Sequence, residues 1–203
     1  MKKTLLILFA ILSVSIAKAQ EVTLLTFESY TFADKLQWEW GDGKVYDGFQ
    51  WGAGLEFGLS EENAIELIYQ NLATDIELTD YTIGGQRRRG EATFNYIFIG
   101  GTRYMPVNET VSGFGTIDVG MVIASPKESQ YDNVTKFTWA GRLGVRVKAN
   151  DRLSMRVHAQ ITNPVQAFGG GLYFGTGGAG AGVSTYSTIW QFNLGGSVNI
   201  RLK

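Results

Sequence analysis

A run of glycines near the end of the chain has the spacing of a nucleotide-binding motif. Gly175, Gly177 and Gly180 match G-x-G-x-x-G, which in dinucleotide-binding folds lies between a strand and a helix that holds the pyrophosphate. The sequence after this motif has the apolar–polar alternation of a strand, and it contains no Asp or Glu to bind a ribose. We therefore predict no nucleotide site and no cofactor, and the glycines need another explanation.

His158 is the only histidine and so the main candidate for an acid–base residue. A catalytic base needs a nucleophile within reach, but Ser154, on the same face of the same strand, would lie about 13 Å away. One histidine, no cysteine and no close cluster of carboxylates also do not make a metal-ligand set. The sequence thus predicts neither an enzyme nor a metal site.

The first 19 residues have the pattern of a secretory signal peptide. Two lysines precede an apolar run over residues 5–16, and residues 17–19 form a small-x-small cleavage site. We expect export, removal of residues 1–19, and a single domain over residues 20–203. Without cysteine this domain cannot use disulfides, and its mild net charge gives no support for nucleic-acid binding.

Most of the remaining sequence alternates between apolar and polar residues with a period of two. In residues 137–148, Phe, Trp, Leu and Val share one face, whereas Thr, Arg and Lys share the other. There are about eight such segments, each with roughly the ten residues that a tilted strand needs to cross a bilayer. The connections between them alternate between short turns and longer loops, the loops falling at about 33–48, 75–90, 125–135 and 163–187. This pattern predicts an all-β fold, an eight-stranded antiparallel up-and-down transmembrane β-barrel.

The alternation by itself does not say which face of the barrel points outward. A soluble, lipocalin-like periplasmic barrel would turn its apolar face inward, around a ligand. We favour the membrane barrel because the polar face carries several arginines and the apolar face almost no charge. Aromatic residues also recur near the strand ends, where membrane barrels have interfacial girdles.

Several segments resemble a known family. GFQWGAGLEFG, YIFIGGTRYMPVNE, SGFGTIDVGM and FGTGGAGAGVSTYS, behind the predicted signal peptide, are similar to the small outer-membrane β-barrels of Gram-negative bacteria, of the OmpA, OmpX and OmpW type within the porin family. The resemblance implies an outer-membrane location and contact with outer-membrane lipid. We expect a structural or surface-interaction role without catalysis, with a narrow pore for small solutes as the alternative.

The charges are distributed unevenly along the chain. Residues 20–135 hold 18 acidic and 7 basic residues, whereas residues 136–203 hold 1 acidic and 8 basic residues. In a closed barrel the first and last strands are neighbours, so these halves face each other across a lumen just wide enough for side chains to fill it. Unpaired charges there would be costly, so we expect an ion-paired plug, with a charged conduit as the alternative. Its predicted members are Glu28, Glu56, Glu66, Arg103, Asp118, Arg142, Arg146, Arg156 and Arg201.

A basic cluster falls in the second predicted outer loop. Arg87, Arg88 and Arg89 follow two glycines there. Such a cluster is able to bind the phosphates of lipopolysaccharide or an acidic glycan. The alternative is a solvated run of charges.

The longest predicted loop, residues 163–187, contains the glycine motif. Glycines there would permit turns with positive φ and close backbone packing. Because Phe168, Tyr173 and Phe174 are too apolar for a freely mobile loop, we expect the loop to fold against the barrel mouth or a partner protein.

Overall fold

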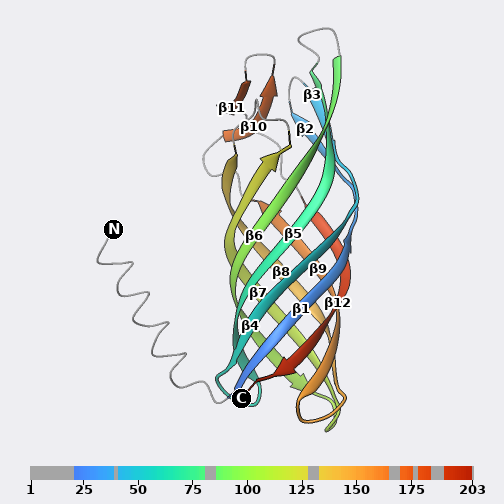
Figure 1. Ribbon diagram of the computed structural model, residues 1–203, viewed down its shortest axis with the longest axis vertical. Coiled ribbons are helices and arrows are strands. Elements are labelled where there is room, and N and C mark those ends of the chain that lie inside the picture. The colour runs from blue at the N-terminus through green and yellow to red at the C-terminus, as the bar shows by residue number, and fades with distance from the viewer. Residues whose placement is uncertain are drawn as a thin grey trace, which may run out of the picture.

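The chain forms a tall barrel of tilted strands in a computed structural model (Figure 1). The model describes residues 21–38, 41–80, 86–127, 133–164, 170–175, 178–183 and 190–202. The strands are β1 (Glu21–Thr31), β2 (Asp34–Trp38), β3 (Gly41–Val45), β4 (Gly48–Gly58), β5 (Asn63–Asp80), β6 (Gln86–Pro106), β7 (Val111–Pro126), β8 (Val134–Lys148), β9 (Leu153–Pro164), β10 (Gly170–Gly175), β11 (Gly178–Val183) and β12 (Gln191–Arg201). The predicted signal peptide lies outside the described residues. Among these residues, no helix has the length and apolar character needed to cross a membrane.

Eight of these strands close into a barrel. The order β5-β4-β1-β12-β9-β8-β7-β6 is completed by pairing of β5 with β6. Every pairing is antiparallel, and the last strand, β12, lies directly beside the first, β1. The predicted eight-stranded antiparallel barrel is therefore confirmed.

The two ends of the barrel have different connections. At one end, here called the turn end, three tight turns over residues 59–62, 107–110 and 149–152 join successive strands. The side chains of Asn108 and Asn150 each accept two backbone N–H groups and so stabilise two of these turns. The longer connections lie at the opposite end, here called the loop end (Figure 1).

Two long strands rise beyond the rest of the barrel at the loop end. The expected loops at 33–48 and 75–90 were largely wrong, because β5 continues to Asp80, β6 begins at Gln86, and β2 and β3 form a hairpin. β3 pairs with the upper part of β5, so that β2, β3, β5 and β6 form an extension of the barrel wall. Val45 and Ala92 are buried in this extension and Ile76 packs against them, so apolar burial stabilises it as strand.

The expected long loop at 163–187 also contains strands. β10 and β11 pair as a separate antiparallel hairpin near the loop end (Figure 1). Phe168 lies outside the described residues. Tyr173 and Phe174 lie on β10, but their side chains also lie outside what the structure describes.

The barrel strands turn apolar side chains outward and polar ones into the lumen over much of the wall. Ile117, Leu143 and Val157 point outward and are 72%, 68% and 71% exposed, respectively. Arg142 and Gln160, from two neighbouring strands, point inward and are 1% exposed. The exterior is thus the apolar surface that an outer-membrane barrel presents to lipid.

Candidate functional site

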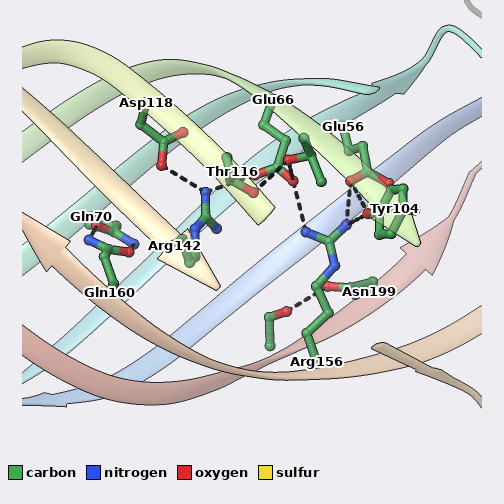
Figure 2. A network of polar contacts seen from close by, with 12 residues as sticks. Glu56, Glu66, Gln70, Tyr104, Thr116, Asp118, Arg142, Arg156, Gln160 and Asn199 are labelled. Atoms are coloured by element: carbon green, nitrogen blue, oxygen red, sulfur yellow. Dashed lines mark hydrogen bonds and ion pairs between the residues drawn. The ribbon is translucent and has the colours of Figure 1, made fainter. Parts of the chain in front are cut away.

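Five charged side chains from five strands meet inside the barrel towards its turn end (Figure 2). We call this set the charged layer, and all its members are buried. Alternation along each strand aims these side chains into the lumen. The members are Glu56 of β4, Glu66 of β5, Asp118 of β7, Arg142 of β8 and Arg156 of β9.

Glu66 lies at the centre of the charged layer. Its Oε2 accepts a hydrogen bond from Arg142 Nη2 at 2.9 Å, and its Oε1 accepts one from Arg156 Nη1 at 2.8 Å. Oε1 also accepts the Thr102 hydroxyl at 2.6 Å. Arg142 reaches a second carboxylate, that of Asp118, at 3.0 Å. One glutamate thus ties two arginines together across the lumen (Figure 2).

Arg156 is held both by hydrogen bonds and by aromatic rings. Its Nη2 donates to Glu56 and to the hydroxyl of Tyr104, and that hydroxyl donates to Glu56 at 2.5 Å. The guanidinium carbon lies 5.3 Å from the Tyr104 ring centroid and 5.2 Å from that of Phe114, within the range of cation–π attraction.

The backbone is shaped to admit these charges. A Cβ added at Gly100 on β6 would lie 2.0 Å from Oδ1 of Asp118, so the glycine leaves the space that the carboxylate occupies. Removing charges from water is costly, and pairing offsets the cost only while each partner remains in place. We therefore expect the charged layer to act as one unit.

Nearer the loop end, the lumen is filled by amides. Gln50 Nε2 donates to Gln70 Oε1 at 3.1 Å, and Gln70 and Gln160 exchange hydrogen bonds at 3.3 and 3.1 Å. Asn193 Nδ2 donates to Gln50 Oε1 at 3.0 Å. These amides link β4, β5, β9 and β12 across the interior.

An apolar cluster also lies inside the barrel. Phe94, Tyr96 and Phe98 stack along β6, with ring centroids 6.4 and 5.8 Å apart. They pack in one buried cluster with Ile68 and Leu72 of β5. Phe94, Tyr96 and Phe98 share a strand face with Thr102 and Tyr104, which bond to the charged layer. This face of β6 therefore points inward, apolar residues included.

Four predicted members of the plug lie outside the charged layer. Glu28 and Arg103 occupy outward positions of β1 and β6, where alternation turns them away from the lumen, and Arg103 pairs with Glu62 at 3.3 Å. Arg201, at the end of β12, pairs with Glu21 at 3.0 Å in a half-exposed position. Arg146 points inward, but it is not ion-paired to any carboxylate among the described residues.

The three consecutive arginines lie on strand β6 and not in a loop as predicted. Arg89 forms a salt bridge with Asp75 at 2.6 Å, and Arg87 lies 4.0 Å from Glu77. Arg88 is exposed and has no ion pair within the described part of the chain. They lie on the extension of the barrel wall because β6 pairs with β5 up to Gln86.

The extension also holds two groups with shifted pKa values. The Tyr46 hydroxyl donates to Glu77 at 3.0 Å, and this hydrogen bond raises the pKa of Tyr46 above its ordinary value of 10.0. The hydrogen bond from Tyr30 lowers the pKa of Asp47 below its ordinary value of 3.8. Tyr46 further lies beneath two cations, Lys44 at 4.2 Å and Arg89 at 4.3 Å from the ring centroid.

His158 lies in the lumen, packed edge-on to Phe27 with ring centroids 6.0 Å apart. Its two ring nitrogens are buried and contact no hydrogen-bonding partner among the described residues. The described residues also contain no group of three or more His, Cys, Asp or Glu side chains that could hold a metal ion.

The sequence interpretation missed the neutral partners of the charged layer. Tyr104, Thr102 and Thr116 all bond within it or beside it, and Gln70 and Gln160 bridge the next level. Parity could have found Gln70, Gln160 and Thr116, which share a strand face with Glu66, Arg156 and Asp118, respectively. It could not have found Thr102 and Tyr104, because the predicted member on β6, Arg103, lies on the opposite face.

Comparison with known proteins shows similarity in fold but not in sequence. No protein-family model matches the chain, and no curated protein matches it in sequence. Among solved structures, Neisserial surface protein A is similar with a TM-score of 0.60 and 9% identity, over 88% of this chain and 96% of its own. The outer membrane protein OprG from Pseudomonas aeruginosa has a TM-score of 0.60 and 10% identity, over 90% of this chain and 97% of its own.

The outer membrane protein AlkL is a third similar structure, with a TM-score of 0.54 and 12% identity over 91% of this chain and 92% of its own. This chain has the fold of the small outer-membrane barrels. The predicted resemblance is confirmed at the level of the fold.

Proposed function

We propose that the protein is an integral outer-membrane barrel that is closed to solutes and acts through structural or surface contacts, without catalysis. The observation that carries the proposal is the distribution of side chains across the wall. The exterior is apolar, whereas the lumen is filled by the charged layer, the amides and the apolar cluster. Such a barrel is anchored by its outside, and its inside stabilises it.

The exterior supports a membrane location. Outward-facing aromatic side chains at the loop end, among them Tyr30, Phe49, Trp51, Phe137 and Trp190, are each about half exposed, as an interfacial girdle requires. A lipocalin-like soluble barrel would instead need a polar exterior. OprG and AlkL, which share the fold, are outer-membrane proteins. In that setting the turn end faces the periplasm and the loop end the outside.

The extension supports a surface role. It places Arg87, Arg88 and Arg89 beyond the apolar belt on the outer side, with Lys127 on the neighbouring strand end. Arg88 has no ion pair among the described residues and is exposed, so its guanidinium is able to bind an external anion. We infer that phosphates of lipopolysaccharide or an acidic glycan bind along this edge.

The environment of His158 supports a non-catalytic role. The ring packs against Phe27, and the His158 Cβ lies beside Gly144, where an added Cβ would be 2.9 Å from it. No hydroxyl of the described residues reaches its nitrogens. A base without a nucleophile or an orienting partner does not make a hydrolytic site.

The location is tested by fractionation combined with gel mobility. We expect the protein in the outer-membrane fraction, with a faster band in unboiled than in boiled samples, because the closed barrel resists SDS until heated. Recovery in the soluble periplasmic fraction without a mobility shift would contradict the proposal.

The surface role is tested by binding of lipopolysaccharide to the purified barrel in micelles. We expect Arg87→Gln/Arg88→Gln/Arg89→Gln to weaken binding and to reduce its salt dependence, since ionic contacts are lost. Arg103→Gln is the matched control, an exposed arginine at the turn end. Equal binding by the triple variant and the control, or equal binding of dephosphorylated lipopolysaccharide, would contradict a phosphate-binding edge.

A further inference from the structure

A cavity of about 500 Å³ opens at the turn end, between the charged layer and the three tight turns. Glu56 of the charged layer forms part of its lining, together with Tyr104 and Arg146. Because Glu56 and Tyr104 are bonded to Arg156, the inner wall of the cavity is part of the hydrogen-bonded network of the charged layer. We call this cavity the vestibule.

Arg146 differs from the other arginines of the lumen. Arg142 and Arg156 each contact two carboxylates, whereas Arg146 has none in ion-pair distance within the described part of the chain. Its Nε is buried without a hydrogen-bond partner there. Among the described residues, Arg146 is thus an arginine of the lumen whose charge is not paired within the barrel, and Lys148 and Arg152, which also line the cavity, are exposed and likewise have no ion pair.

The position of Arg146 favours recognition of an oxyanion. Its guanidinium carbon lies over the ring of Tyr104, 3.7 Å from the ring centroid, within the range of cation–π attraction. Tyr104 is itself fixed by its hydrogen bond to Glu56. A cation–π contact uses none of the N–H donors of a guanidinium, and these donors are able to bind a carboxylate or a phosphate by two parallel hydrogen bonds.

The neighbouring groups explain why Arg146 has no internal counter-charge. Arg156 lies directly opposite Arg146 across the β8–β9 ladder and forms ion pairs with both Glu56 and Glu66. On its other side the ladder partner of Arg146 is Ser112, a neutral hydroxyl that also lines the cavity. The other carboxylates of the lining belong to the rim: Glu21 is paired with Arg201, and Glu61, Glu109 and Asp151 are exposed on the three tight turns.

We propose that the vestibule binds a small organic anion from the periplasmic side, a carboxylate or a phosphate ester, with Arg146 as its principal contact. The volume lies in the range of small-molecule sites and exceeds what a lone anionic group needs, so the anion is carried on a larger molecule. This binding is independent of contacts at the outer surface.

The test is a titration of the purified barrel in micelles with a small anion, monitored by the NMR signals of the arginine Nε–H groups. Succinate is the carboxylate probe and inorganic phosphate the phosphate probe, each at constant ionic strength. We expect the Arg146 signal to shift with saturation while that of Arg103 does not. We also expect Arg146→Gln to weaken binding by about tenfold or more, the effect of losing a charged hydrogen-bond donor. Arg103→Gln, the matched control at the same end, should bind as the wild type does.

The two probes assign the ligand class, since saturation by only one of them selects the carboxylate or the phosphate. Absence of a saturable shift with both probes, or equal weakening in the Arg146 and Arg103 variants, would overturn the proposal. If Arg146→Gln does not give a heat-modifiable barrel, the wild-type titration decides by itself, because a saturable shift must be centred on the Arg146 signal.

Discussion

The charged layer and the apolar cluster fill neighbouring levels of the same lumen by different physical means. Glu66 and Ile68 are two residues apart on β5, point inward together and are 0% and 1% exposed. Glu66 is stabilised by three directed contacts, whereas Ile68 is stabilised by packing among many neighbours. We infer from this difference that loss of any one member should destabilise the whole charged layer. In the apolar cluster, the loss of stability should instead scale with the number of buried atoms removed.

Of the substitutions considered, Glu66→Gln should lower the free energy of unfolding most. The change leaves Arg142 and Arg156 with one carboxylate each, and breaking a buried pair costs about 3–5 kcal/mol. The free energy of unfolding is measured by urea titration of the barrel in lipid vesicles, with tryptophan fluorescence as the readout. A loss below about 1 kcal/mol would show that the charged layer does not act as a unit.

Ile68→Val is the matched change in the apolar cluster. It removes one buried methylene, and we expect the free energy of unfolding to fall by about 1 kcal/mol in the same titration. A loss as large as that of Glu66→Gln would mean that the two levels of the lumen are equally cooperative.

The exposed ion pair of Arg103 and Glu62 allows an ion pair outside the lumen to be compared with the buried pairs of the charged layer. Their side chains are 71% and 49% exposed, so solvent screens the interaction. We expect Glu62→Gln to lower the free energy of unfolding by about 0–1 kcal/mol. A loss of several kcal/mol would contradict the view that burial, and not ion pairing as such, gives the charged layer its importance.

The smallest expected effect is a pH dependence in the extension. The pKa of Tyr46 is raised in the folded state, so its contribution to stability is present below pH 10.0 and is lost as the pH rises through the folded-state value. The pKa of Asp47 is lowered, so its contribution is present above pH 3.8 and is lost as the pH falls through the folded-state value.

Titration of tyrosinate absorbance, with Tyr46→Phe subtracted, measures the pKa of Tyr46 directly. Because the hydrogen bond to Glu77 is the main cause of the shift, we expect Glu77→Gln to return that pKa towards 10.0. An unchanged pKa in this variant would rule out Glu77 as the cause.

The barrel and part of its charged layer were predictable from the sequence because a period of two is a local signal. It shows which residues share a strand face, and Glu56, Glu66, Asp118, Arg142 and Arg156 were found in this way. The assignment of Glu28 failed because parity within one strand does not say which face is inward. That choice is made by pairing with neighbouring strands, here β4 and β12.

The extension was predicted least well, for a related reason. Residues 75–90 contain charges and glycines that are typical of loops, yet β5 and β6 pair through most of them. Their strand structure depends on contacts distant in sequence, such as the pairing of β3 with β5. In the same way, the inward turn of Phe94, Tyr96 and Phe98 follows from the register of β6 and is not visible in the composition of that strand.

The central claim is that the lumen is closed by the side chains that fill it. Single-channel recording in planar bilayers tests this most directly, using protein whose heat-modifiable mobility shows a folded barrel. We predict no discrete conductance steps above the lipid baseline, because the charged layer, the amides and the apolar cluster place buried side chains at successive levels of the lumen. Reproducible ohmic steps from the folded protein would contradict the account and establish a pore.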